Sequence, residues 1–405
     1  MRAVERPTYM NWLASHIGTP VVKVLTGIRR AGKSTLLTAL AEQLRTSPDT
    51  GPVVHLDFDL FENFHLATAP ALHSYLRAAA PNGRYHLLLD EVQEVDGWER
   101  LVNSLVAEGR ADIYLTGSNS RLLSSELGTY LTGRYVSIEV ATLSFREHLE
   151  FASTLRGRDP EAIQTEFQAY LRRGGFPGLY LADYSDSQAA QITSDIFNSI
   201  LTRDVLTRHP VRQPEMFERV CRFALDSVGS PLSARSIARY MKAQQRPISH
   251  PTVAEYFDYL TEAYLLTRVP RYDLRGRDLL ATNEKYYAGD HGMITALLGA
   301  DDSRLPGLLE NVVAAELARR GYRVAVGKQG EAEVDFVADR RAERIYVQVA
   351  TSILDQTTRT REFAPLAAIS DAHPKYVVSL DTLEPSNTDG IRRMPVPDFL
   401  LADTW

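Results

Sequence analysis

The sequence predicts an α/β protein whose first part is a parallel sheet covered by helices on both faces. Apolar, β-branched segments alternate with amphipathic segments through the first 150 residues, and this alternation is typical of such sheets. The glycine-containing octet GIRRAGKS joins the first apolar segment to the first amphipathic one, and these sheets bind ligands at the carboxyl ends of their strands. We expect strands at 21–26, 52–59, 85–90, 112–118 and 135–140, and helices at 33–45, 71–80 and 97–109.

Three further segments follow the sheet. The first is expected to be a helical lid, interrupted at the sequence RRGGFPGLY. The second shows the order helix, turn, helix, hairpin, which is the order of a winged helix-turn-helix. The third returns to alternating helix and strand patterns. The expected domains are 1–145 for the first sheet, 146–210 for the lid, 211–300 for the winged helix, with helices at 233–241 and 252–266 and a hairpin around Gly276, and 301–405 for the last α/β domain.

Composition excludes several classes of protein. The chain has 405 residues, 44% hydrophobic and 24% charged, which is ordinary for a globular protein. Its net charge of −6 argues against a surface coated for nucleic acid. Cys221 is the single cysteine, so no internal disulfide or cysteine-based zinc cluster can form. Because no apolar stretch is long enough to cross a bilayer, we expect a cytoplasmic protein without a membrane partner.

The octet matches the phosphate-binding pattern G-x-x-x-x-G-K-[ST]. Two glycines let backbone N–H groups turn toward phosphate oxygens, a lysine reaches the β- and γ-phosphates, and a serine hydroxyl coordinates Mg²⁺. A strand before and a helix after supply the context that the pattern needs, so we predict that the protein binds ATP with Mg²⁺. The side chains of Arg29 and Arg30 are expected to leave the cradle as interface or solvated groups. The residues expected around the nucleotide are Gly27, Ile28, Arg29, Arg30, Ala31, Gly32, Lys33, Ser34 and Thr35.

Two adjacent carboxylates end the third predicted strand, LLLDE. Asp90 is placed to hold the Mg²⁺ shell, and Glu91 is placed to polarise an attacking water. Adjacent acids after a strand can also signal the start of a helix, but the phosphate loop upstream favours catalysis. Glu91 favours hydrolysis over binding alone.

Polar residues after the fourth strand and before the fifth complete the predicted site. In TGSNS, Ser118 or Asn119 is placed to reach the γ-phosphate or the attacking water, although such residues also form turns without any function. Arg134, in LTGRY, is a candidate arginine finger for phosphoryl transfer, often supplied by a neighbouring subunit. A lone surface arginine is the alternative.

Eight motifs spread over nearly the whole chain carry a resemblance to a known family. They are GIRRAGKST, LLLDEVQ, YLTGSNS, LTGR, LSFREHLEF, GGFP, KYYAGDHG and EVDFV…YVQVA. Together they resemble bacterial and archaeal ATPases of the AAA superfamily that join an N-terminal AAA domain to a winged helix and a C-terminal restriction-endonuclease-like domain. The resemblance implies Lys33 and Ser34 on phosphate and Mg²⁺, and Asp90 and Glu91 as the Mg²⁺ and water residues.

The resemblance also implies a γ-phosphate sensor, an assembly and a base contact. Asn119 or Ser118 would be the sensor. Arg134 would act in trans, which implies a homo-oligomer, with a ring as one arrangement. GGFP is similar to a lid element near the adenine, which makes Pro177 a candidate for contact with the base, while the same element can equally be a tight turn between helices.

The C-terminal segment lacks half of a nuclease site. A restriction-type nuclease needs an acid on a helix, an aspartate on a strand, and a glutamate and lysine on the next strand, because carboxylates bind Mg²⁺ and the lysine orients water. Glu310 and Asp335 are present, but Gln348 and Ala350 stand where the glutamate and lysine are expected. We therefore expect this domain to be catalytically inactive.

The winged-helix segment gives the strongest indication of a nucleic-acid partner. Between residues 203 and 285 there are 14 Lys and Arg and 10 Asp and Glu, a balance of +4 in a chain of −6. This excess favours contact with phosphates. The second helix is less favourable, because it carries Glu255, Asp258 and Glu262. DNA is therefore a candidate partner, and a role at an interdomain or oligomer interface is the alternative. The cations are Arg235, Arg239, Lys242 and Arg246 before that helix, and Arg271, Arg275 and Arg277 along the hairpin.

These patterns predict a Mg²⁺-dependent ATPase that couples its nucleotide state to a conformational change, with DNA as a candidate site of action. Two other functions stay open from the sequence. One is a signalling or scaffold switch that binds ATP or ADP and turns over slowly. The other is an ATP-regulated nuclease.

Overall fold

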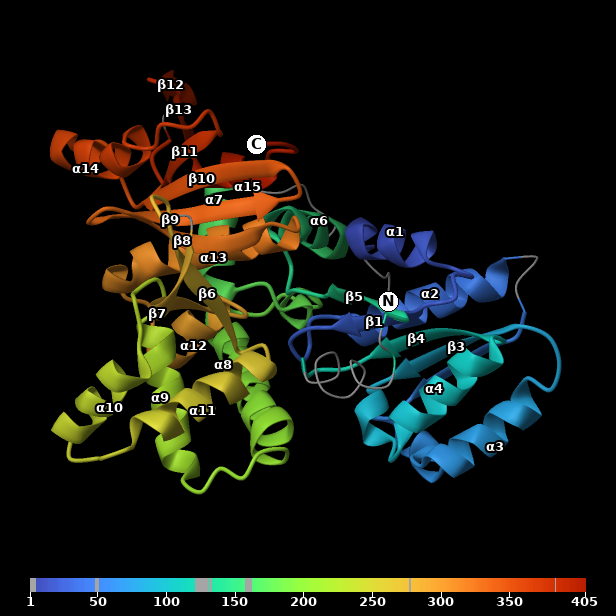
Figure 1. Ribbon diagram of the computed structural model, residues 1–405. Helices are drawn as coiled ribbons and strands as arrows, with labels where there is room; N and C mark the ends of the chain where they lie inside the picture. The colour runs from blue at the N-terminus through green and yellow to red at the C-terminus, as the bar shows by residue number, and fades with distance from the viewer. Residues whose placement is uncertain are drawn as a thin grey trace. The chain divides into compact units, whose positions relative to one another are not determined.

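The chain folds into two compact units, each of which is described here by itself (Figure 1). The computed structural model describes residues 5–47, 51–120, 131, 133–156, 162–276, 278–382 and 384–405. The first unit is Met1–Thr142 with Glu262–Tyr264, and the second is Leu143–Thr261 with Leu265–Trp405. Within the described ranges, no helix has both the length and the apolar character that crossing a membrane requires.

The first unit is built on a five-stranded sheet in the order β2-β3-β4-β1-β5, and every pairing in it is parallel. The predicted α/β fold with a parallel five-stranded sheet is therefore confirmed. Each strand starts and ends within a few residues of its expected bounds, because its apolar, β-branched run was long enough to identify it. The strands are β1 (Val22–Thr26), β2 (Val53–Asp57), β3 (Tyr85–Asp90), β4 (Ala111–Thr116) and β5 (Tyr135–Glu139).

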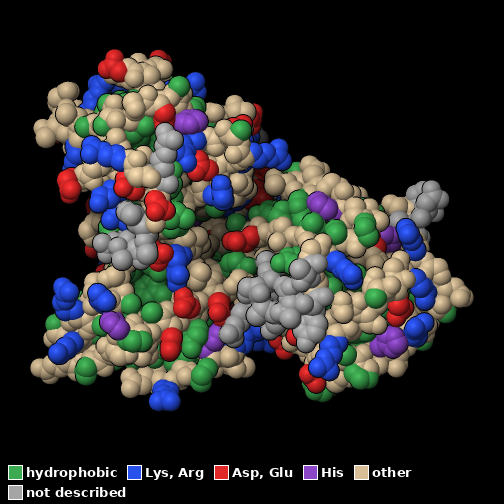
Figure 2. Space-filling model, viewed as in Figure 1, with side chains coloured by type: hydrophobic (Ala, Val, Ile, Leu, Met, Phe, Trp, Pro, Cys, Tyr) green, Lys and Arg blue, Asp and Glu red, His purple; other side chains and the backbone are tan. Residues whose placement is uncertain are grey.

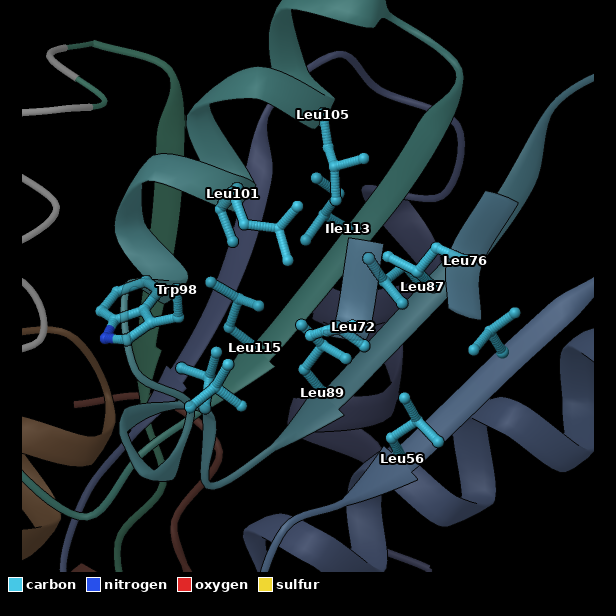
Figure 3. Packing of buried hydrophobic residues seen from close by; sticks show 14 of the residues in the cluster. Leu56, Leu72, Leu76, Leu87, Leu89, Trp98, Leu101, Leu105, Ile113 and Leu115 are labelled. Atoms are coloured by element: carbon cyan, nitrogen blue, oxygen red, sulfur yellow. The ribbon is translucent and has the colours of Figure 1, made fainter. Parts of the chain in front are cut away.

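Helices cover both faces of this sheet. Figure 1 shows α1 and α2 on one side and α3 and α4 on the other. The cluster that joins α3 and α4 to the sheet is rich in leucine (Figure 3), and each such side chain contributes about 1.5–3 kcal/mol when buried. This packing holds the strands in place, so their carboxyl ends form a fixed edge. The elements are α1 (Pro7–Ser15), α2 (Lys33–Thr46), α3 (Ala69–Ala79), α4 (Trp98–Glu108) and the 3₁₀ turns η1 (Phe61–Leu66) and η2 (Val92–Glu94).

The second unit begins with helices. The expected helix-turn-helix pair is present as α10 (Ala234–Ala243) and α11 (His250–Glu262). A capping box from Ser233 and Ser236 starts α10. The other helices are α6 (Phe145–Arg156), α7 (Ile163–Arg173), the 3₁₀ turn η4 (Pro177–Tyr180), α8 (Asp186–Ser199), the π-helical η5 (Ile200–Leu206), α9 (Pro214–Asp226), α12 (Gly292–Leu298), η6 (Asp302–Arg304), α13 (Leu305–Arg319), α14 (Gln356–Ala367) and α15 (Val396–Leu401).

One eight-stranded sheet runs through the second unit, in the order β12-β13-β11-β10-β9-β8-β6-β7. The expected hairpin around Gly276 is present, formed by β6 and β7 in antiparallel register. Because β6 also pairs in parallel with β8, the hairpin and the C-terminal strands form one continuous sheet. The strands are β6 (Leu266–Asp273), β7 (Asp278–Ala288), β8 (Arg323–Gln329), β9 (Ala332–Arg340), β10 (Glu343–Ala350), β11 (Lys375–Ser379), β12 (Ser386–Thr388) and β13 (Ile391–Pro395).

Two of the glycine-containing motifs, GGFP and KYYAGDHG, cross each other inside the second unit. The Asp290 carboxylate accepts hydrogen bonds from Gly175 N–H at 2.8 Å and from Gly292 N–H at 2.9 Å. A Cβ at Gly174 would lie 2.1 Å from Asp290 Oδ1 and 2.7 Å from Gly292 Cα. Only glycine permits so close an approach of two backbones, so this crossing gives the glycines of GGFP a structural role.

A buried polar cluster secures the amino-terminal edge of the first sheet. The Asp112 carboxylate on β4 accepts hydrogen bonds from Lys23 on β1, from Gly18 N–H at 2.9 Å and from Tyr114 Oη at 3.0 Å, and it lies 2.9 Å from His86 Nδ1 on β3. Burial opposes ionisation, but the bonds from His86 and Lys23 prevail and lower the pKa of Asp112 from 3.8 to about 2. The ionised carboxylate therefore ties three adjacent strands together.

This cluster predicts acid sensitivity of the first unit. The folded-state pKa of Asp112 is below its ordinary value, so its contribution of about 2 kcal/mol is present above pH 4 and is lost as the pH falls toward 2. Urea unfolding of the wild type and of Asp112→Asn should show a difference in free energy that shrinks over this window. Asp96→Asn, at an exposed aspartate of the same unit, should show no such window. An Asp112→Asn effect that stays constant between pH 5 and pH 2 would contradict the assignment.

Candidate nucleotide site

The octet forms a loop between the end of β1 and the start of α2, as predicted. Gly27 has φ of 129° and Gly32 has φ of 100°, in the region that favours glycine. A Cβ at Gly27 would lie 2.3 Å from Val140 O, so even alanine cannot fit there without moving the backbone after β5. Ile28 and Ala31 are buried and anchor the loop in the core. The two glycines therefore give the loop its tight path over the end of the sheet.

Lys33 and Ser34 open α2 directly beneath this loop. The buried Lys33 Nζ donates hydrogen bonds to Gly27 O at 2.9 Å and to Ile28 O at 3.1 Å. Carbonyl oxygens solvate an ammonium group but do not neutralise it, so its charge is available to an anion in the loop. The Ser34 side chain hydrogen-bonds to Asp90, and both Ser34 and Thr35 are exposed on the first turn of α2. The positive end of the helix dipole lies at the same place.

Thr116 joins the two acidic residues of the site. Its hydroxyl, at the end of β4, donates to Asp90 Oδ1 at the end of β3. The Thr116 hydroxyl oxygen also accepts a hydrogen bond from Glu91 N–H at 2.9 Å. Asp90 also pairs in register with Asp57 at the end of β2. The carboxyl ends of β2, β3 and β4 therefore place these polar groups beside the loop that follows β1.

The surroundings of Asp90 raise the pKa of its carboxyl group. Burial, together with the charges of Glu91 and Asp57, raises the pKa of Asp90 from 3.8 to about 6, although hydrogen bonds from Thr116 and Ser34 oppose the shift. Burial also raises the pKa of Asp57. A carboxyl group with a pKa near 6 releases its proton readily when a cation arrives. The hydroxyl of Ser34 and the carboxylate of Asp90 are the oxygen ligands that Mg²⁺ prefers, so the residues present fit the predicted ion.

Glu91 has an unusual backbone conformation. Its φ is 52° and its ψ is 50°, in the left-handed region that non-glycine residues rarely adopt. Such outliers collect at functional sites, where the surrounding structure holds them in place. The Glu91 side chain is buried and accepts a hydrogen bond from Gln93 Nε2. The Glu91 carboxylate is therefore held at the carboxyl ends of the strands rather than directed into solvent.

The predicted sensor residues lie just past the end of β4. Ser118 and Asn119 are both buried, and the preceding Gly117 N–H donates to Leu25 O on β1 at 3.1 Å. This bond draws the segment toward the loop after β1. The structure thus brings both candidates to the same edge as Lys33 and Asp90, and the choice between them stays a prediction.

Arg6 stabilises the phosphate loop through side-chain hydrogen bonds that sequence analysis did not predict. Its buried guanidinium donates to Ala31 O at 2.9 Å, to Ala141 O at 2.9 Å and to Thr142 O at 3.4 Å. It also lies over the Tyr9 ring, 4.4 Å from the centroid. The partners are up to 136 residues away in the sequence, and no local pattern marks such an arginine. Arg6 is a positioning residue that ties the loop to the segment after β5.

Of the two alternatives expected for Arg29, the solvated one is wrong, and a place at an interface stays a prediction. Its side chain is buried rather than solvated, and its Nη1 lies 3.6 Å from Asp59 Oδ2. The segment after β2 supplies this aspartate, which gives Arg29 an acidic partner at the same edge of the sheet. Arg30 is exposed, as expected, and has a left-handed backbone with φ of 67°.

Arg134 lies away from this edge, and Pro177 is not part of the same unit. Arg134 is exposed, and its carbonyl accepts a hydrogen bond from Val22 N–H at 2.9 Å, at the start of β1. It therefore lies at the amino-terminal edge, about five residues, or roughly 16 Å, from the phosphate loop of its own chain. Pro177 belongs to the second unit, where it begins η4 and is half-buried. Its contact with the base stays a prediction.

A second candidate site, the C-terminal carboxylates, is occupied by a lysine of the same chain. Lys285 Nζ on β7 lies 3.0 Å from Glu310 Oε2, 2.8 Å from Glu333 Oε1 and 3.6 Å from Asp335 Oδ1. The Tyr287 hydroxyl donates to the same Glu310 oxygen at 2.9 Å. Burial opposes the charge of Lys285, but the carboxylates raise its pKa above the usual range. The ammonium group thus lies between the carboxylates of Glu310, Glu333 and Asp335.

Gln348 and Ala350 differ from a nuclease pair in the structure as well. Gln348 Nε2 donates to Glu362 Oε2 on α14 at 2.9 Å, and Gln348 Oε1 accepts from Asp335 N–H at 3.3 Å. Ala350 is buried in the apolar core under α14. The side-chain amide of Gln348 therefore links α14 to the backbone of β9. That this domain is catalytically inactive stays a prediction.

The architecture and the loop define the class of the first unit. Residues 19–149 match a family described as an AAA domain, and residues 164–304 match one described as a domain of unknown function, DUF8612. The walker-type ATPase PABY2304 of Pyrococcus abyssi superposes with a TM-score of 0.54 over 73% of this chain and 96% of that one. With 17% identity, this likeness concerns the fold alone.

A whole-length relative shows the family. A protein of Haemophilus influenzae described as uncharacterized is 34% identical over 402 residues, which is 98% of this chain and 98% of that protein. The chain belongs to the same family, and its N-terminal part is an AAA domain. A second relative, protein MJ1544 of Methanocaldococcus jannaschii, is 27% identical over 350 residues, 84% of this chain and 77% of that protein.

The Lys285 cluster predicts a pH-dependent stability effect. Lys285→Met leaves the buried Asp335 and the partly buried Glu310 and Glu333 without their central cation, which should reduce the free energy of unfolding by about 3 kcal/mol at pH 7. The loss should be smaller at pH 5, because protonation then removes the unbalanced charge. Urea unfolding at both pH values measures it. Lys328→Met, on β8 of the same sheet, is the matched control and should cost less than about 1 kcal/mol. Equal losses for Lys285→Met at both pH values would contradict the ionic role.

Proposed function

We propose that the protein is a Mg²⁺-dependent ATPase that converts ATP and water to ADP and phosphate. The single observation that carries this proposal is the convergence of Lys33, Ser34, Asp90 and Glu91 on one edge of the parallel sheet, with Thr116 hydrogen-bonded to both acidic residues. The match of residues 19–149 to an AAA domain supports the nucleotide assignment.

The residues of the loop bind and orient the nucleotide. The backbone of Gly27–Gly32 presents N–H groups to phosphate oxygens. Lys33 is already desolvated and held against the loop, so it loses little entropy when it contacts phosphate. Ser34 and Asp90 supply the oxygen ligands of the metal ion. Mg²⁺ held by Ser34 and Asp90 would offset the negative charge of the phosphates.

Glu91 is the proposed base that orients the attacking water. Its carboxylate is buried, and both its backbone N–H and its side chain are fixed by hydrogen bonds. A fixed carboxylate can be held within hydrogen-bond reach of the attacking water, which a general base requires. Ser118 or Asn119 is proposed to sense the γ-phosphate. This base favours hydrolysis over a switch with slow turnover, and measured turnover distinguishes the two.

Arg134 is proposed to complete the site of another copy of the chain. It is exposed and lies at the opposite edge of the sheet from its own loop, so it cannot reach the nucleotide bound there. A homo-oligomer with a head-to-tail interface would bring this arginine to a neighbour, and a ring is one closed form of such an interface. Hydrolysis would then drive a conformational change in the second unit, with DNA as a candidate partner.

Two substitutions test the proposal. Lys33→Ala should weaken ATP binding at least tenfold, because it removes a charge-assisted contact worth about 1.5–3 kcal/mol. Glu91→Gln should keep ATP affinity within about threefold and reduce turnover about 100-fold or more, because the base is lost and the shape is kept. Titration calorimetry with ATP measures binding, and phosphate release measures turnover.

The control for Glu91→Gln is Glu94→Gln, at an exposed glutamate in the same turn, η2. It should change neither ATP affinity nor turnover. Normal turnover in Glu91→Gln would remove the assignment of the base, while normal ATP binding in Lys33→Ala would remove the assignment of the loop.

A further inference from the structure

The helix α10 and the turn after it carry four cations that form no ion pair among the described residues. We call Arg235, Arg239, Lys242 and Arg246 the α10 stripe; all four are exposed. Most other arginines of the second unit have acidic partners close by. Examples are Arg173 with Asp186, Arg222 with Glu218, Arg268 with Asp258, Arg304 with Asp226, Arg320 with Glu316 and Arg344 with Asp339.

The geometry of the helix places these cations on one face. With 3.6 residues per turn, Arg235, Arg239 and Lys242 fall within an arc of about 60°. Ile237 and Met241 occupy the opposite side and are buried. The stripe is therefore the outward face of α10, and the helix cannot turn it inward without exposing its core side.

The turn after α10 extends the stripe. The N–H of Arg246 donates to Met241 O at 2.9 Å, which folds the turn back against the last helical residues. Gln245 has a left-handed backbone with φ of 59°, and this conformation lets the chain fold back toward the end of α10. The backbone of the fourth cation, Arg246, thus stays close to the last turn of α10.

Acidic side chains are absent from this stretch of sequence. Residues 227–254 contain no Asp or Glu, in a chain whose net charge is −6. Figure 2 shows Lys and Arg side chains gathered over α10 at the lower left, and Asp and Glu side chains over α11 beside it. On α11, Glu255 and Asp258 are exposed. The boundary between the two charges therefore lies between the two helices.

The stripe costs stability in the isolated chain. Like charges at i and i+4, as at Arg235 and Arg239, destabilise a helix. Arg235 is also the second residue of α10, where the positive end of the helix dipole disfavours a cation. A partner that supplies negative charge along the helix would offset both the repulsion between the cations and the unfavourable interaction with the helix dipole.

We propose that the α10 stripe binds the phosphate backbone of a nucleic-acid duplex, without reading its sequence. From Arg235 to Lys242 the helix rises about 10 Å, which spans about three phosphates of one strand. Sites for single strands add aromatic rings on which bases stack. The exposed aromatic of α10, Tyr240, lies about 100° or more around the helix from the stripe and packs against the Phe223 ring. The acidic face of α11 would repel phosphates, so α10 makes the contact rather than the second helix of the pair.

Binding of the full chain to a fluorescent duplex tests the proposal, with no nucleotide present so that the outcome does not depend on ATP hydrolysis. Anisotropy is measured from about 50 to 200 mM salt. The triple variant R235Q/R239Q/K242Q should bind at least tenfold more weakly, and its slope of log K against log salt should fall by about two to three.

Two control variants separate the stripe from total charge. R84Q/R100Q/R323Q removes the same charge from exposed arginines elsewhere and should keep the affinity within about threefold; R235K/R239K keeps the charge and should do the same. Equal loss in R84Q/R100Q/R323Q, or no loss in the stripe variant, would overturn the proposal. Wild-type binding to anionic vesicles or to polyglutamate, but not to the duplex, would also overturn it and assign the stripe to a membrane or an acidic protein.

Discussion

The candidate nucleotide site depends on one constraint, the parallel adjacency of β1, β4 and β3. In this order the carboxyl ends of the three strands lie side by side. The segments that follow these strands are therefore close to one another. A single hydroxyl, that of Thr116, then hydrogen-bonds to both Asp90 and Glu91. At the other edge, Asp112 links the same three strands through Lys23 and His86. The sheet is thus held at both ends of the strands that carry the chemistry.

The two units use buried charge in different ways. At the edge of the first sheet, burial and neighbouring acids raise the pKa of Asp90 to about 6, which leaves the site with negative charge that a metal ion can satisfy. In the second unit, Lys285 already satisfies a comparable group of carboxylates. The carboxylates around Asp90 can accept a metal ion, whereas the carboxylates around Lys285 already have the lysine ammonium group as their cation.

The sequence predicted those features that depend on neighbouring residues. The strands of the first sheet, the loop and the helix-turn-helix pair follow from local apolar periods and glycine spacing, and the structure has them near the expected positions. Arg6 and Lys285 escaped prediction, because their partners come from segments distant in the chain and no pattern links them. The buried position of Arg29 escaped for the same reason, since its acidic partner Asp59 follows a different strand. Long-range pairing of charges is what local periodicity does not encode.

The central claim is that a complete ATPase site requires two copies of the chain, one for the loop and one for Arg134. The most direct test is phosphate release per chain as a function of protein concentration, over roughly a thousandfold range, because mass action then controls the fraction assembled. Activity per chain should rise with concentration and reach a plateau in the wild type, and Arg134→Ala should stay low throughout. Activity per chain that is constant in the wild type over the whole range, and unchanged in Arg134→Ala, would contradict a shared site.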